Sequence, residues 1–250
     1  MSAAATDTNG AGRLHGRLAL VTGASAGIGR ATALALAREG CAIIVTGRRD
    51  AALAALTQEC AALGVSARHL AGDLNDDTFV DQLGALAAEA DIFINNAGVL
   101  TYAPLLELTP AQNAAMFQTN VLACLRVSQV MGMAMTQRKR GHIVMMTSLS
   151  ARNIARFAVV YGATKHAMAG ITKGLRIELK GAGIKVTEIA PGMVDTEIRD
   201  ASTHPQVVAE FASRKYQPLS AADVADAVVY AVCTPPHVCP DLIELRPTAA

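Results

Sequence analysis

The sequence of 250 residues predicts an α/β fold in which one doubly wound parallel sheet of about seven strands carries helices on both faces. Short apolar segments alternate with longer helical segments along the whole chain. The short segments are apolar almost throughout, as expected for parallel strands that are buried on both faces. No linker rich in proline, glycine or polar residues divides the chain, so we expect a single domain over residues 14–250.

Local signals place the elements in order. Glycines follow three of the predicted helices directly, at Gly40, Gly64 and Gly181, where they end a helix readily. Thr109 and Pro110 are a typical cap and first residue of a helix. The predicted strands are 17–21, 42–46, 67–71, 91–95, 142–147, 185–189 (ended by Pro191) and 242–245. The predicted helices are 28–39, 51–63, 76–90, 110–137, 159–180 and 221–233.

Composition and charge exclude several classes of protein. The 22 Lys and Arg residues nearly balance the 21 Asp and Glu residues, which gives no electrostatic argument for binding nucleic acid or a membrane surface. No apolar segment approaches the ~18 residues that a membrane-spanning helix needs. Residues 1–13 lack the apolar centre of a secretory signal, so we expect a flexible tail. The five cysteines are scattered and the histidines do not cluster, which indicates reduced thiols, a cytoplasmic location and no metal site.

Tyr161 and Lys165 are the most informative pair in the sequence. Residues four apart on a helix lie on one face. A phenol has a pKa near ~10, and lowering it to about 7 takes roughly 4 kcal/mol. One positive charge at ~4 Å in an effective dielectric constant near 20 supplies about that energy. The pair therefore predicts a general acid/base that needs neither a histidine nor a metal.

A glycine-rich turn follows the first predicted strand, in the segment TGASAGIG at 22–29. Gly23 permits the turn, while Gly27 and Gly29 allow close approach of the backbone and tight packing of the helix. The helix N-terminus offers amides and a positive dipole to a pyrophosphate. This arrangement predicts a Rossmann-type dinucleotide site.

The end of the second strand bears on the choice of nucleotide. Thr46 and Gly47 are followed by Arg48 and Arg49, where NAD sites commonly have a carboxylate that holds the ribose 2′-hydroxyl. Arg48 could grip a 2′-phosphate instead, so NADP(H) is favoured and NAD(H) is possible. Alternatively both arginines are ordinary loop charges, and Asp50 could serve as the missing acid.

Polar residues also follow the third and fourth strands. Asp73 could accept a hydrogen bond from adenine or could cap the next helix. Asn95 and Asn96, followed by Ala97 and Gly98, could either join strands or line the ribose.

In order and spacing, these motifs resemble the short-chain dehydrogenase/reductase family. The similarity covers TGASAGIG, the pair at 73–74, NNAG at 95–98, Asn120, Ser148, YGATK at 161–165 and PGMVDT at 191–196. The resemblance implies that Tyr161 moves the proton and that Ser148 holds the substrate oxygen. It implies that Lys165 binds the nicotinamide ribose and lowers the phenol pKa, and that Asn120 holds a water linked to Lys165.

The resemblance also implies that Thr196 and the backbone of Val194 anchor the carboxamide. The expected cofactor-binding residues are Gly23, Ser25, Ala26, Gly27, Ile28, Gly29, Arg48, Arg49, Asp73, Leu74, Asn95, Ala97, Gly98, Tyr161, Lys165, Pro191, Gly192, Val194 and Thr196.

The C-terminal segment 242–248 is similar to that of bacterial NADP-dependent 3-hydroxy acid, serine and clavulanate dehydrogenases. We therefore expect a small alcohol/carbonyl pair, bound between segment 149–160 and a polar lid at 195–216. A substrate carboxylate would be bound by Arg152 or Arg199, unless both are solvated. An apolar ketone or a 3-oxoacyl thioester is the alternative substrate, with Leu149, Ile154, Phe157 and Met193 lining the pocket. Outside enzymes, the alternative is a regulatory protein that senses NADP without turnover.

The two long helices, 110–137 and 159–180, carry apolar residues on more than one face. This pattern suggests contacts between subunits, and the resemblance implies homotetramers or dimers.

Overall fold

The computed structural model describes residues 12–249. The expected tail at 1–13 therefore lies mostly outside the described residues. Arg13 is an exception, because its guanidinium donates two hydrogen bonds, of 2.8 and 2.6 Å, to the carboxylate of Glu39. The amide of Leu14 also donates to the carbonyl of Glu39 at 2.8 Å. Arg13 and Leu14 thus both contact Glu39, which follows α1.

In the described residues, seven parallel strands form one sheet in the order β3-β2-β1-β4-β5-β6-β7. This confirms the predicted fold class, and all of the predicted strands are present. The strands are β1 (Leu18–Thr22), β2 (Ala42–Gly47), β3 (Ala67–Ala71), β4 (Ile92–Asn95), β5 (Gly141–Met146), β6 (Ile184–Pro191) and β7 (Leu242–Leu245).

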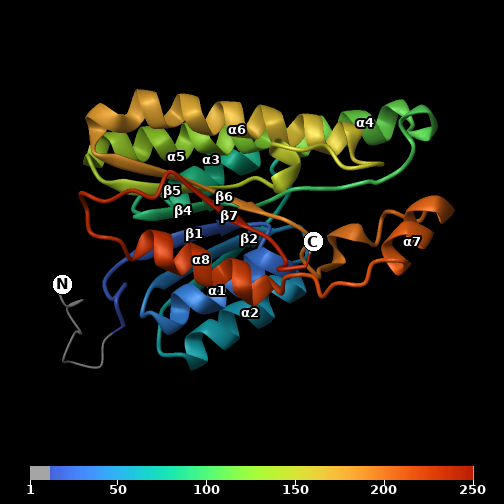
Figure 1. The fold of residues 1–250 in the computed structure, drawn as a ribbon. Coiled ribbons are helices and arrows are strands. Elements are labelled where there is room, and N and C mark those ends of the chain that lie inside the picture. Colours follow the sequence, from blue (N-terminus) through green and yellow to red (C-terminus); the bar gives the residue numbers. More distant parts are fainter. Residues whose placement is uncertain (1–11, 250) are drawn as a thin grey trace.

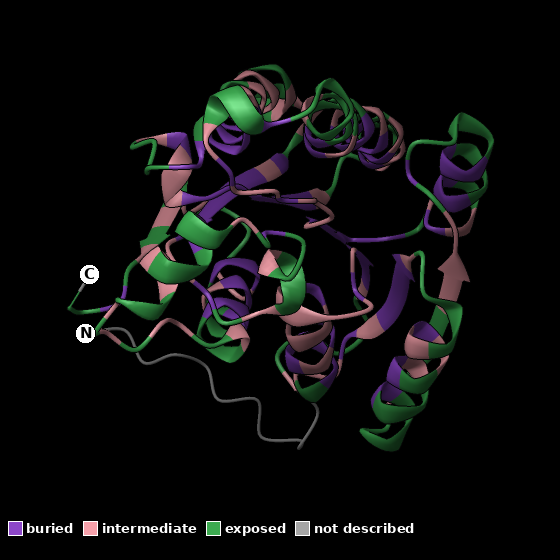
Figure 2. Cartoon of the chain, turned by 90° about the vertical axis from the view of Figure 1, so that its right-hand side faces the viewer, coloured by how far each residue is buried: buried purple, intermediate pink, exposed green. Residues whose placement is uncertain are grey.

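Helices cover the two faces of the sheet (Figure 1). One face packs against α1 (Gly27–Arg38), α2 (Asp50–Ala62) and α8 (Ala221–Val232). The other packs against α3 (Asp77–Leu86), α5 (Cys124–Arg138) and α6 (Val159–Leu179). The strands are buried between the two layers, whose outer surfaces are exposed (Figure 2). Among the described residues, no helix combines the length and apolar character that crossing a membrane requires.

The predicted helix 110–137 is divided in the structure. It consists of α4 (Pro110–Phe117), a π-helical turn at Gln118–Ala123, and α5. Thr109 caps α4 and forms the expected reciprocal hydrogen bonds with Gln112. A second difference is at Pro191, which is the last residue of β6 and pairs with Leu245 of β7, so the strand extends two residues beyond its predicted end at 189.

The strand order reverses between β1 and β4, which are neighbours although two strands separate them in the sequence. In parallel sheets, ligands bind outside the carboxyl ends of the strands at such a switch point. The connections after β4 and β6 carry short helices, η1 (Leu105–Glu107), η5 (Glu197–Arg199) and α7 (Pro205–Ala212), at this edge of the sheet. The fold therefore brings the glycine turn, the asparagine pair and the end of β5 to one place.

Candidate active site

Ser148, Tyr161 and Lys165 meet at the carboxyl edge of the sheet. Ser148 follows β5 and precedes the short helix η3 (Leu149–Ala151), while Tyr161 and Lys165 lie one turn apart near the start of α6. Their exposed fractions are 8, 9 and 6 %, so all three are buried in the protein. All three also line one cavity of about 840 Å³. Sequence spacing and fold therefore agree on this cluster.

Lys165 is held by the backbone of the neighbouring strand. Its Nζ donates to the carbonyl of Met146 at 3.0 Å and lies 5.6 Å from the centroid of the Tyr161 ring. The hydroxyl of Ser148 accepts a hydrogen bond from the amide of Ser150 at 3.1 Å. These contacts hold the amine and the hydroxyl in place near the Tyr161 side chain.

Burial governs the protonation of Tyr161. It raises the pKa of the phenol to about 12, and a hydrogen bond with Ser148 acts in the opposite direction. Burial likewise lowers the pKa of Lys165, because removal from water penalises the charged amine. Burial therefore acts against the lowering of the phenol pKa that is expected from Lys165, and it favours the protonated phenol at neutral pH.

The side chain of Asn120 is hydrogen-bonded within the protein, whereas the resemblance implies that it holds a water linked to Lys165. It lies in the π-helical turn, is 1 % exposed, and donates from its amide to the carbonyl of Val99 at 2.9 Å and to Oγ1 of Thr164 at 3.2 Å. Its Oδ1 accepts from the amide of Val99 at 2.7 Å. Both amide hydrogens are thus used within the protein. The side chain joins the loop after β4 to α6, and Asn120 does not line the cavity.

The glycine turn is built for close approach. Gly23 has a φ of +63°, and a Cβ there would lie 2.8 Å from Cα of Ala97. Gly27 has a φ of +54°, which side chains with a Cβ rarely adopt. A Cβ on Gly29 would lie 2.5 Å from the carbonyl oxygen of Gly23, so Gly29 serves the packing of α1 and does not line the cavity. These positions leave the first turn of α1 open to a ligand phosphate, and the turn fits the predicted dinucleotide.

Most of the expected cofactor-binding residues surround the cavity. Those that line it are Gly23, Ser25, Ala26, Gly27, Ile28, Arg48, Arg49, Asp73, Leu74, Ala97, Gly98, Tyr161, Lys165, Pro191, Gly192, Val194 and Thr196. Asp73 accepts hydrogen bonds from Asn75 at 3.0 and 2.9 Å, while Asp76 caps α3. The predicted alternative in which Asp73 caps this helix is therefore wrong.

Asn95 lies away from the cavity. Its amide donates at 2.9 Å to the carbonyl of Cys124 and to the hydroxyl of Ser128, both on α5. Its neighbour Asn96 lines the cavity and donates to the carbonyl of Thr22 at 2.9 Å. Asn95, the last residue of β4, therefore points toward the helix layer of α5, whereas Asn96 follows the strand and faces the cavity.

The two arginines after β2 have different surroundings. Arg49 forms an ion pair of 3.1 Å with Glu197 and donates to the carbonyl of Ser25 at 3.0 Å. Arg48 is exposed at the rim of the cavity and has no hydrogen bond or ion pair with residues 12–249. Asp50 contacts His69 at 3.3 Å and does not line the cavity. Arg48 is thus the arginine that is open to a ligand.

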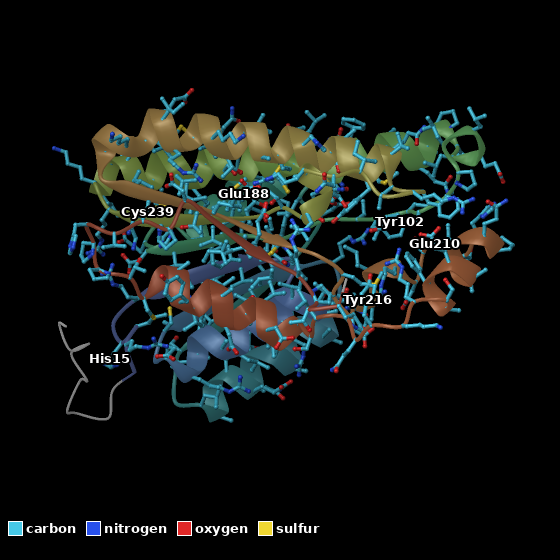
Figure 3. All side chains as sticks on the ribbon, in the orientation of Figure 1. His15, Tyr102, Glu188, Glu210, Tyr216 and Cys239 are labelled. Atoms are coloured by element: carbon cyan, nitrogen blue, oxygen red, sulfur yellow. The ribbon has the colours of Figure 1, made fainter. Side chains whose placement is uncertain are left out.

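Tyr102 lines the far end of the cavity and was not among the expected site residues, whereas Phe211, Arg214 and Tyr216 belong to the expected lid segment 195–216. Tyr102 packs edge-on against Tyr161, with ring centroids 6.0 Å apart, and against Phe211 at 5.4 Å. The guanidinium of Arg214 lies 4.5 Å from the Phe211 centroid and donates to the hydroxyl of Tyr216 at 3.3 Å. Tyr102 and Tyr216 lie near α7, which carries Glu210 (Figure 3). No motif marks Tyr102, since only the fold brings the loop after β4 to α7.

Arg152 does not line the cavity. Its Nη1 lies 2.8 Å from Oε1 of Glu188, in the sheet. The hypothesis that Arg152 binds a substrate carboxylate is therefore wrong. Arg199 does line the cavity, although it is also 3.1 Å from the carboxylate of Asp195.

The expected lid segment, 195–216, contains η5 and α7 and is tied to the rest of the protein by polar contacts. His204 lies 2.9 Å from Glu107 of η1, and Arg156 lies 3.7 Å from Glu210. The hydroxyl of Ser202 accepts from the amide of Tyr102 at 2.9 Å. The segment thus closes one side of the cavity.

The cavity is strongly cationic. Seven of its lining residues are cations and two, Asp73 and Glu197, are carboxylates. The cations are Arg48, Arg49, Arg156, Lys165, Arg199, Arg214 and Arg246. Such a lining favours anionic ligands. Among residues 12–249, no group of three His, Cys, Asp or Glu side chains could hold a metal ion.

Comparisons with known proteins agree with this geometry. Residues 17–206 match the family model described as short chain dehydrogenase. An uncharacterized oxidoreductase of Staphylococcus epidermidis is 33 % identical over 235 residues, which are 92 % of this chain and 97 % of that protein. The closed form of serine dehydrogenase complexed with NADP+ is similar with a TM-score of 0.85 and 27 % identity, covering 93 % of this chain and 96 % of that one.

A metagenomic short-chain oxidoreductase in complex with NADP is similar with a TM-score of 0.79 and 29 % identity, covering 94 % of this chain and 99 % of the other. The family model matches well over half of the chain, and it includes the glycine turn and the Ser148, Tyr161 and Lys165 cluster. The chain therefore belongs to the short-chain dehydrogenase family of oxidoreductases.

Proposed function

We propose that the protein is an NADP-dependent oxidoreductase that interconverts a small carbonyl compound and its alcohol. The observation that carries this proposal is the meeting of Ser148, Tyr161 and Lys165 in the same cavity as the glycine turn. A nicotinamide cofactor, when bound, supplies or accepts the hydride. The glycine turn, Arg48 and Thr196 would hold it, since all line the cavity.

The chain's own residues would handle the proton and the substrate oxygen. The neutral phenol of Tyr161 donates its proton to the oxygen of a carbonyl that is being reduced, and Ser148 holds that oxygen by a hydrogen bond. The amine of Lys165, fixed at 3.0 Å from the Met146 carbonyl, keeps a positive charge beside the phenol as it loses its proton. The cluster is buried, so each of these interactions is stronger than it would be in water.

The environment of Arg48 supports NADP over NAD. Its guanidinium has no partner in the described residues, and no carboxylate from the start of α2 lines the cavity. An unpaired guanidinium is a good ligand for a 2′-phosphate. Both solved structures described above were determined with NADP or NADP+.

A substrate with a carboxylate, such as a 3-hydroxy acid, fits the far end of the cavity. Arg199 and Arg214 lie there with the aromatic rings of Tyr102 and Phe211, and both arginines line the cavity. Serine, the substrate named for the similar dehydrogenase, is itself a 3-hydroxy acid. We assign the carboxylate contact to Arg214, whose guanidinium lines the cavity, stacks on the Phe211 ring and donates to the Tyr216 hydroxyl, although it is also 3.3 Å from the carboxylate of Glu210.

The test is a substrate screen followed at the absorbance of the reduced nicotinamide, with NADPH and NADH in parallel. We expect turnover with NADPH and carboxylate-bearing carbonyls. Arg214→Gln should raise KM for these by about ten-fold or more, since a charge-assisted contact is lost, and should leave neutral ketones unaffected. Arg68→Gln is the control, because Arg68 is exposed and does not line the cavity.

The alternatives give different outcomes in the same screen. Preference for apolar ketones or 3-oxoacyl thioesters, with no effect of Arg214→Gln, would contradict the carboxylate substrate. Tight binding of NADPH without turnover of any carbonyl would indicate a protein that senses the nucleotide.

We further propose that the protein associates through α4, α5 and α6. Exposed apolar side chains on these helices and the π-helical turn support this, namely Phe117, Leu122, Met133 and Ile177. Sedimentation should show a dimer or tetramer, and a stable monomer would refute the proposal.

A further inference from the structure

Glu188 is a carboxylate buried inside the sheet. It lies on β6, beside Met145 of β5, and only 1 % of its surface is exposed (Figure 3). Burying a charge is costly unless other groups pair with it. The groups that pair with the Glu188 carboxylate therefore indicate the role of this buried charge.

Both partners of Glu188 belong to the segment that carries Ser148. Oγ1 of Thr147 donates to Oε1 of Glu188 at 2.7 Å, and Nη1 of Arg152 lies 2.8 Å from the same oxygen. Thr147 directly precedes Ser148, and Arg152 follows it by one turn of chain. A single carboxylate oxygen thus contacts both ends of residues 147–152, which we call the Ser148 turn, by a hydrogen bond at Thr147 and an ion pair at Arg152.

The same network reaches the rim of the cavity. Nε of Arg152 lies 3.4 Å from Glu244 of β7, and Glu244 lies 3.3 Å from Arg246, which lines the cavity. The neighbouring carbonyl of Leu245 accepts a hydrogen bond of 2.8 Å from the amide of Gly192, another lining residue. Arg152 therefore connects the Ser148 turn to the C-terminal strand, and the backbone of that strand is in turn bonded to the loop after β6.

We propose that Glu188, with Arg152, is a positioning residue that clamps the Ser148 turn and so sets where the Ser148 hydroxyl meets the substrate oxygen. Glu188 and Arg152 do not line the cavity and act only through the turn. Catalysis depends steeply on such placement, because a displacement of about 1 Å can cost about a hundred-fold in rate. The catalytic part of this inference rests on the proposed function, whereas the clamping of the turn does not.

The test compares Glu188→Leu and Glu188→Gln with a matched control. Leucine fills a similar volume without an acceptor, whereas glutamine keeps an oxygen for Thr147. The control is Asp91→Asn, because Asp91 is also buried, with 5 % exposure, and lies 3.1 Å from Arg140 and 3.7 Å from Arg138. It directly precedes β4 and therefore lies at the amino ends of the strands, away from the Ser148 turn.

Hydrogen exchange gives a readout that needs no substrate. The amides of Ala151, Arg152 and Asn153 form hydrogen bonds of 2.9 to 3.0 Å within the turn and report its opening. In Glu188→Leu we expect these amides to exchange at least about ten-fold faster, while Glu188→Gln changes them less and Asp91→Asn leaves them unchanged. Unchanged exchange in Glu188→Leu, or the same acceleration in Asp91→Asn, overturns the clamp.

Kinetics test the catalytic consequence. In Glu188→Leu, kcat for the best carbonyl of the screen should fall about ten- to a hundred-fold, with KM for NADPH unchanged, and Glu188→Gln should recover part of the loss. An unchanged kcat with faster exchange overturns the positioning role. If Glu188→Leu does not fold, Thr147→Val removes one arm of the clamp and is judged by the same two readouts. A wild-type protein without turnover refutes the proposed function, and the exchange result still decides the clamp.

Discussion

The protonation state of Tyr161 decides in which direction the site works at a given pH. Burial raises the pKa of the phenol to about 12, so the proton is present throughout the neutral range. A protonated phenol can donate to a carbonyl oxygen, whereas oxidation of an alcohol needs the phenolate as the acceptor. With Tyr161 as the proposed acid/base, the protonated phenol favours carbonyl reduction at neutral pH.

This difference predicts opposite pH profiles. Below the phenol pKa, the phenolate fraction rises ten-fold per pH unit, so alcohol oxidation should accelerate by up to about ten-fold per unit from about pH 7 to about pH 10. Carbonyl reduction should stay nearly flat over this range. Initial rates in both directions measure it. Tyr161→Phe is the control, since it should lose both activities and still bind NADPH, and turnover retained in that variant would reject Tyr161 as the acid/base.

Arg48 carries the second prediction for a single residue. Because its exposed guanidinium is unpaired at the cavity rim, Arg48→Ala should raise KM for NADPH by about ten-fold or more and leave KM for NADH unchanged. Arg68→Ala serves as the control, since Arg68 is exposed and outside this cavity. Equal effects on the two cofactors would show that Arg48 does not contact a 2′-phosphate.

The sequence could predict which residue types build the site, but not every side-chain direction. Spacing along one helix placed Tyr161 and Lys165 together, because helix geometry is local. The pairing of Arg152 with Glu188 joins a short helix to a neighbouring strand, and nothing in the sequence around Arg152 marks a partner 36 positions away. Asn96 lines the cavity where Asn95 was expected to do so. Which of the two faces the cavity depends on where β4 ends, and a residue pattern locates strand ends only to within a few positions.

Among the elements, the lid segment depends on contacts between short pieces of structure. α7 begins after His204, whose ring is 2.9 Å from Glu107 of η1. This contact joins the connection after β6 to the connection after β4, on either side of the cavity. Both connections cover the substrate end, so their association should influence how well a substrate is retained.

Glu107→Gln should therefore weaken closure of the lid. Because the contact is partly exposed and such pairs contribute modestly, we expect KM for the carbonyl substrate to rise about two- to five-fold without loss of kcat. Steady-state kinetics measure this, with Glu178→Gln as the control, since Glu178 is exposed and has no ion pair with the described residues. A fall in kcat at constant KM would contradict a role in retaining substrate.

The π-helical turn is a part of the predicted helix 110–137 that the sequence pattern could not predict. The apolar pattern from 110 to 137 continues without proline or glycine until Gly132, and therefore predicts one helix. The extra residue in the turn at Gln118–Ala123 accompanies tertiary hydrogen bonds of Asn120 with Val99 and Thr164. Such turns often occur at functional sites, but their position follows from packing and not from periodicity.

Across the whole molecule, the sheet was predictable because its strands are apolar almost throughout, and its order follows the usual doubly wound pattern. Buried polar residues within that sheet were not predictable as such. His142 of β5 is one, with 4 % exposure and a contact of 2.8 Å between Nε2 and Oγ1 of Thr187 on β6. Burial, with a smaller effect of the charge on Lys185, lowers the pKa of His142 to about 3.

This shift predicts how stability depends on pH. Below the unfolded pKa of 6.5, the unfolded chain binds a proton that the folded protein does not, so His142 favours unfolding increasingly until the pH reaches about 3. One proton corresponds to about 1.4 kcal/mol of unfolding free energy per pH unit. His142→Gln keeps a hydrogen-bonding group for Thr187 and cannot titrate. The unfolding free energy of this variant should therefore fall less steeply with decreasing pH than that of the wild type, and the two slopes should differ by at most this amount. Urea unfolding of both proteins between about pH 4 and about pH 7 measures the difference, in which the carboxylates common to both cancel.

His15→Gln, at an exposed position, should keep the wild-type slope. Equal slopes for His142→Gln and the wild type would mean that His142 binds its proton equally well in the folded protein.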